Sequence, residues 1–110
     1  MADYETVRKI ALSLPNVEEG LSYGAPALKA GEKLIIRLRE DLDSVVVLTT
    51  FEIREELIEA EPETYYITDH YLNYPYVLVS LEHVGEDALG EMIGNSYKLA
   101  IAARKPSRKK

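Results

Sequence analysis

The chain has 110 residues, which is enough for one domain that buries a core without disulfides or metals. It contains no cysteine, and this excludes disulfide scaffolds, thiolate metal sites and cysteine nucleophiles. The net charge of −6 is unevenly spread, because residues 1–97 hold seven basic and all nineteen acidic residues, whereas residues 98–110 hold six basic and no acidic ones. An acidic body opposes nucleic-acid binding, which depends on cationic contacts with phosphates.

The chain is predicted to begin with a helix. Apolar residues recur at helical spacing after the possible N-cap Asp3, and they predict a helix over residues 4–14 that Pro15 ends. Residues 16–24 are polar and rich in turn formers, so we expect at most a short extended piece there, near residues 21–23.

Three strands are predicted next. Runs rich in apolar and β-branched residues place them at residues 26–30, 34–39 and 44–49, separated by a Gly31-Glu32 turn and an acidic turn at 40–43. Side chains alternate between the two faces of a strand. We therefore expect Arg37 and Arg39 to point away from the core face that Leu34, Ile36 and Leu38 share.

The second half of the chain predicts two more helices and two more strands. Thr49 and Glu52 have capping-box spacing, and Pro62 lies beyond the end of the helix that they open. We expect Ile53, Leu57 and Ile58 to form its buried stripe, with Glu52, Glu55, Glu56 and Glu59 exposed. The remaining elements are strands at 65–67 and 76–81, a loop at 68–75 and a helix at 86–104.

This order of elements predicts a two-layer α+β fold. Short links between consecutive strands force antiparallel pairing, because parallel strands need long crossovers. The expected architecture is α-β3-α-β2-α, one antiparallel sheet with the helices packed on one face. The other face is expected to remain open to solvent or to a partner. We expect a single domain over residues 1–104 and a basic, disordered tail over residues 105–110.

The sequence indicates no catalytic or metal site. His70 and His83 are the only imidazoles, neither Ser80 nor Ser96 lies in a G-x-S-x-G motif, and phosphate-binding loops are absent. We therefore predict no enzymatic activity, no cofactor and no bound metal. We also expect a cytoplasmic protein without membrane segments, because the first residues lack a signal-peptide pattern and the apolar runs are short.

Three groups of residues are candidates for binding. Five tyrosines fall within twelve residues, and a tyrosine combines apolar area with a hydrogen-bonding tip, as recognition surfaces require. The candidates are His70, Tyr71 and Tyr74 in this loop, Arg37 and Arg39 on the sheet, and Lys98, Arg104 and Lys105 near the end of the chain. Each group also has a structural explanation: tyrosines cover sheet edges, and surface arginines pair with glutamates.

Several segments resemble the MmcQ/YjbR-like family of small bacterial proteins. They are SLPNVEEGLSYGAPALKAGEKLIIRLRED, FEIREELIEAEPETYYIT, HYLNYPYVLVSL and NSYKLA, in this order over most of residues 12–100. The resemblance implies the same α-β3-α-β2-α fold, similar to secretion-chaperone-like domains. It also implies DNA binding through a "double wing" surface. Tyr76 stands where the family often has tryptophan.

Two functions therefore stay open. The first is weak DNA binding that depends on the basic tail. The second is binding of a protein or peptide through the exposed sheet face and the tyrosine-rich loop. The acidic charge of residues 1–97 favours the second, whereas the resemblance favours the first. The sequence does not indicate an oligomeric state.

Overall fold

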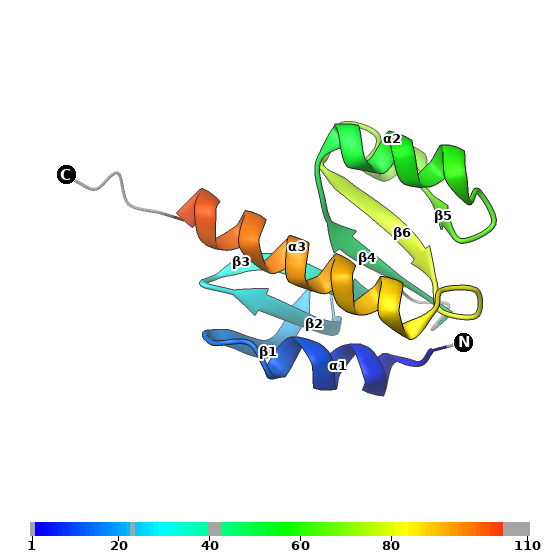
Figure 1. The fold of residues 1–110 in the computed structure, drawn as a ribbon. Helices are drawn as coiled ribbons and strands as arrows, with labels where there is room; N and C mark the ends of the chain where they lie inside the picture. The colour runs from blue at the N-terminus through cyan, green and yellow to red at the C-terminus, as the bar shows by residue number, and fades with distance from the viewer. Residues whose placement is uncertain (1, 23, 40–42, 105–110) are drawn as a thin grey trace.

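The computed structural model describes residues 2–22, 24–39 and 43–104 (Figure 1). The predicted tail at 105–110, which includes Lys105, lies outside these residues. The elements in chain order are α1 (Tyr4–Leu12), β1 (Val17–Ser22), β2 (Ala25–Ala30), β3 (Lys33–Leu38), β4 (Ser44–Leu48), α2 (Phe51–Ala60), β5 (Tyr65–Tyr66), the 3₁₀ turn η1 (Asp69–Tyr71), β6 (Tyr76–Ser80) and α3 (Glu86–Arg104).

All six strands form one antiparallel sheet in the order β1-β2-β3-β4-β6-β5. The predicted α+β fold is confirmed. The Gly31-Glu32 turn is also where the sequence placed it, and both residues have positive φ, as a tight two-residue hairpin turn requires. Helix α3 runs diagonally across the sheet, and α1 lies beside it (Figure 1).

The prediction for residues 16–24 was incomplete. Instead of a short extended piece, β1 is a six-residue strand that pairs with β2 along its whole length, so four strands precede α2. This strand is hard to predict because β1 is an edge strand with four consecutive exposed residues, from Glu18 to Leu21. Such a strand lacks the apolar alternation by which strands are recognised.

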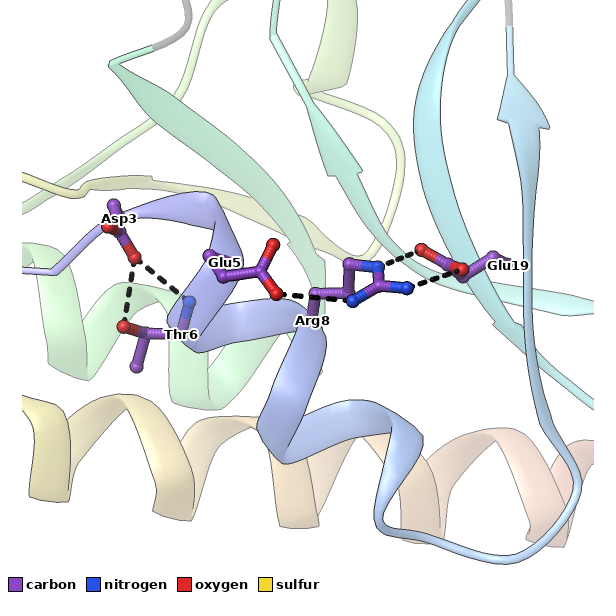
Figure 2. Close-up of polar contacts among 5 residues, drawn as sticks. All are labelled: Asp3, Glu5, Thr6, Arg8 and Glu19. Carbon is purple, nitrogen blue, oxygen red and sulfur yellow. Dashed lines mark hydrogen bonds and ion pairs between the residues drawn. The ribbon is translucent and has the colours of Figure 1, made fainter.

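Helix α1 is capped and attached by polar contacts (Figure 2). The Asp3 carboxylate accepts hydrogen bonds from the backbone N–H and the hydroxyl of Thr6, each at 2.9 Å, so the predicted N-cap is present. The Arg8 guanidinium bonds to both carboxylate oxygens of Glu19 on β1, and it also donates to Glu5 at 3.2 Å. Arg8 thus joins the helix to the edge strand.

The core lies between the sheet and the helices. Ile36, Val47 and Val77 occupy neighbouring positions on three central strands, and all three are fully buried. Leu89 and Ile93 of α3 complete this apolar cluster. Within the described residues, no helix combines the length and apolar character that crossing a membrane requires.

The opposite face of the sheet is closed at its centre, which corrects the expectation that it is open. Ala27, Arg37, Val46, Leu78 and Tyr66 form one row across five strands. Val46 and Leu78 are fully buried, and Arg37 is 7% exposed. The Arg37 side chain lies along this face, where its Nε donates to the Ser22 carbonyl at 3.1 Å. A long arginine stem covers apolar surface in this way while its head group remains hydrogen-bonded.

Helix α2 differs from its predicted pattern in one respect. The glutamates Glu52, Glu55, Glu56 and Glu59 are exposed as predicted, but Ile53, Leu57 and Ile58 are only half-buried. The one fully buried residue of the helix is Arg54. The attachment of α2 to the domain therefore involves a buried cation in addition to an apolar stripe.

Candidate binding site

The side chain of Arg54 lies at the centre of the tyrosine-rich loop. Its Nη1 donates to the backbone carbonyls of Tyr71, Tyr74 and Tyr76 at 3.0, 2.8 and 3.2 Å, and its Nη2 donates to the Leu72 carbonyl at 3.1 Å. One side chain of α2 thereby fixes four carbonyls of the segment that leads into β6. Arginine suits this task because its planar guanidinium presents several donors in a fixed fork.

The position of Arg54 on α2 explains its burial. The helix is capped by Thr50, one residue after the predicted Thr49: the Thr50 hydroxyl accepts from the Ile53 N–H at 3.1 Å. Arg54 precedes Leu57 and Ile58 by three and four residues, so it falls on the apolar stripe. It is the only lysine or arginine between residues 40 and 97, a segment with fourteen acidic residues. Arg54 is not among the predicted site residues, although its isolation among acidic residues is a usable signal.

The positive charge of Arg54 is balanced by carbonyl dipoles and by an aromatic ring. The guanidinium carbon lies 4.9 Å from the centre of the Phe51 ring, in cation–π geometry. Its Nε is buried without a hydrogen-bond partner. A buried charge is tolerated only when surrounding groups replace its hydration, and here backbone carbonyls supply most of that replacement.

Ring contacts reinforce the loop. The His70 ring meets Tyr71 edge to face at 4.7 Å, and Tyr71 lies 6.2 Å from Tyr76. The Tyr76 hydroxyl donates to the Leu34 carbonyl on β3 at 3.0 Å, and burial raises the pKa of this phenol. The loop is therefore joined to the sheet as well as to α2.

This fixed backbone presents apolar side chains to solvent. Four large apolar residues of the described chain are exposed, and three of them contact or flank Arg54: Phe51 (47%), Leu72 (52%) and Tyr74 (56%). His70 is also exposed, with its ring 6.4 Å from that of Tyr74. We call Phe51, His70, Leu72 and Tyr74 the loop platform. Exposed apolar groups on an ordered backbone are typical of interaction sites.

The surroundings of the loop platform are acidic. Glu52, Glu55 and Glu56 are exposed on α2, and the exposed Asp69 begins η1. Arg54, the only cation of this part of the chain, is buried. The accessible charge beside the platform is therefore negative. Across the described residues, no three histidine or carboxylate side chains converge as a metal site would need.

Comparison with known proteins identifies the family. The YjbR family model matches residues 12–99, which include the loop platform and Arg54. The chain belongs to the YjbR family. The structure is similar to that of the YjbR-like protein DR2400 of Deinococcus radiodurans, described as a DUF419 domain, with a TM-score of 0.80 and 23% identity over 100% of this chain and 84% of that one. This identity supports a common fold and nothing more. No curated protein matches the chain.

The other predicted site residues of this YjbR domain are dispersed. Of the two sheet arginines, Arg37 is buried in the cross-strand row, and Arg39 is half-buried directly after β3. Lys98 is exposed on α3, and Arg104 is the last residue of that helix, with its side chain outside the described part. The structure thus brings together His70, Tyr71 and Tyr74. Arg37, by contrast, is buried among the side chains of the sheet and lies apart from this group.

Proposed function

We propose that this YjbR domain is a non-enzymatic binding domain that recognises a basic segment of another protein through the loop platform. The observation that carries the proposal is the set of four hydrogen bonds from Arg54 to loop carbonyls beneath three exposed apolar side chains. A loop that is ordered in advance loses little conformational freedom on binding. Exposed aromatic and large apolar side chains supply most of the affinity at such surfaces.

Charge favours a basic partner. The exposed carboxylates of Glu52, Glu55 and Glu56 stand beside the platform without an accessible lysine or arginine on α2. Complementary charge speeds association and disfavours partners of the same sign. We therefore propose a segment in which one or two apolar side chains are flanked by lysine or arginine.

Three labelled peptides test this proposal by fluorescence anisotropy: KRLFKR, the acidic EDLFED and the non-apolar KRGGKR. We expect KRLFKR to bind more tightly than either of the others. The variant Leu72→Ser with Tyr74→Ser should weaken its binding at least about tenfold, since truncation of interface hot spots costs about 2 kcal/mol or more. Both residues are exposed, so the variant should retain the fold.

The matched control is Leu21→Ser. Leu21 is the fourth exposed large apolar residue, at 69%, and it lies on the edge strand β1. The control should bind KRLFKR as the unmodified protein does. Equal binding of the acidic and basic peptides, or equal loss in the platform variant and the Leu21 control, would contradict the proposal.

DNA binding is a second candidate, supported by one feature of the chain. Every acidic residue precedes residue 92, whereas six of the last thirteen residues are cationic, beginning with the exposed Lys98. A cluster of this kind at one end provides contacts for phosphates that the rest of the domain lacks. A salt series with full-length and truncated protein tests this candidate.

A further inference from the structure

A groove separates α2 from α3 on the core side of the sheet. Its volume is about 220 Å³. The lining residues come from four elements and the residue after β4: Leu48, Thr49, Ile53, Leu57, Tyr65, Ala88, Glu91, Met92 and Asn95. Neither Arg54 nor any residue of the loop platform lines the groove.

The groove has an apolar interior that the fold leaves uncovered. Ile53 and Leu57 of α2 are half-buried, and so are Ala88 and Met92 of α3. If α2 and α3 packed directly against each other, these four side chains would be buried in the interface between the two helices. Methionine adapts its flexible side chain to ligands of different shape, which favours Met92 as part of a binding wall.

One tyrosine contributes a polar group to the groove wall. Tyr65 is 4% exposed, and its side chain lines the groove. Burial raises the pKa of the Tyr65 phenol, and the negative charges of Glu61 and Glu91 raise it further. The Tyr65 hydroxyl therefore stays protonated, so it can both donate and accept a hydrogen bond near the carboxylates of Glu61 and Glu91.

The polar lining is suited to a cation. Glu91 contributes the only formal charge among the groove residues, and Thr49, Tyr65 and Asn95 contribute neutral polar groups. The volume is below the range of about 300–1,000 Å³ that holds drug-sized ligands. The site therefore suits a small molecule with one positive charge.

We propose that the α2–α3 groove binds a small organic cation, namely a primary amine with a short aromatic or branched apolar body. The ammonium group lies near Glu91. The apolar body fills the space between Ile53, Leu57 and Met92, and the Tyr65 hydroxyl is a hydrogen-bonding group of the groove wall.

The test uses three probes of similar shape: 2-phenylethylammonium, neutral 2-phenylethanol and anionic phenylacetate. Affinity and location are read from backbone amide shifts in NMR titrations of the full chain. We expect the cation to shift the amides of Ile53, Leu57 and Met92 and to bind up to about fivefold more tightly than the alcohol, since an exposed ion pair contributes about 1 kcal/mol or less. Phenylacetate should bind most weakly.

Substitutions distinguish the contribution of the Glu91 charge from that of the groove volume. Glu91→Gln should equalise the cation and the alcohol, whereas Glu59→Gln, a change of the same type on the exposed side of α2, should leave the preference intact. Ala88→Leu should fill the groove and abolish the shifts of all three probes. The proposal is overturned if the cation has no preference over the alcohol, if the preference survives Glu91→Gln, or if the shifts lie outside the groove.

Discussion

The Arg54 guanidinium and the Tyr74 carbonyl, twenty residues apart in the chain, are joined by a 2.8 Å hydrogen bond. Three further bonds from Arg54 accompany it, and none of the four acceptors is a carboxylate. The charge of Arg54 therefore serves to order a loop backbone. This arrangement couples the first turn of α2 to the surface on which Leu72 and Tyr74 are displayed.

Replacement of Arg54 should disturb the loop more than a typical helix substitution. Arg54→Ala should lower the free energy of unfolding by more than about 2 kcal/mol, because it removes four hydrogen bonds from a charged donor and such bonds contribute about 1.5–3 kcal/mol each. Arg54→Lys should recover only part of this loss, since one ammonium does not reproduce the guanidinium fork. Denaturant unfolding and amide exchange of residues 69–76 measure both effects. Glu55→Ala is the control, and a loss below about 0.5 kcal/mol for Arg54→Ala would contradict the assigned role.

Because the second face of the sheet is closed, we expect a substitution on that face to cost more stability than a substitution on α2. Leu78 is fully buried on that face, whereas Leu57 of α2 is half-buried beside the groove. Leu78→Ala should cost about 2–5 kcal/mol, the range for a fully buried leucine, and Leu57→Ala should cost less. Chemical denaturation of the two variants provides the comparison. If Leu57→Ala proved the more damaging change, the burial assigned to the second face would be wrong.

The contact between Arg8 and Glu19 predicts a pH-dependent attachment of α1. The hydrogen bond from Arg8 holds the pKa of the Glu19 carboxylate below its usual value of 4.5. Because the pKa is lower in the folded state, the stabilisation is complete above the unfolded pKa and is lost as the pH falls through the folded value. Acid titration followed by NMR should show α1 and β1 loosening in this range. Glu19→Gln should remove the dependence at β1 and leave at α1 only the part due to the Asp3 cap, whose hydrogen bonds with Thr6 lower the pKa of Asp3. The exposed neighbour Glu18→Gln should preserve the whole dependence.

The strands with the strongest apolar patterns could be predicted from the sequence because their residues are buried on one or both faces. β4 is buried throughout, and its β-branched run indicated a strand directly. β1 gave no comparable signal, because the pairing of Val17 with Ala30 depends on main-chain bonds rather than on side-chain character. The position of such an edge strand is determined by its main-chain hydrogen bonds to the neighbouring strand, here β2.

The candidate site could be predicted only in part, for a similar reason. The clustering of His70, Tyr71 and Tyr74 is local in sequence and needed no tertiary information. The partners of Arg54 are backbone carbonyls, which every residue has, so no side-chain pattern identifies them. For Arg37, strand alternation predicted the face, but its burial depends on contacts with other strands, such as its bond to the Ser22 carbonyl, which no local pattern shows.

The position of the cations in the chain determines which residues DNA binding would require. Residues 105–110 contain Lys105, Arg108, Lys109 and Lys110, and the chain up to residue 104 has nine basic and nineteen acidic residues. Truncation after Arg104 leaves α3 complete. If the protein binds duplex DNA, this truncation should abolish binding. The full-length protein should show a slope of log affinity against log salt of about −3 to −4, because each phosphate contact contributes about 0.9. Fluorescence anisotropy with a labelled duplex measures both quantities.

Lys98→Gln is the matched single-charge control and should reduce the slope by about one at most. Arg37 is unsuitable as a probe because its burial would mix loss of stability with loss of binding. Affinity that survives truncation but is lost in Arg39→Gln would instead place the DNA contact at the end of β3.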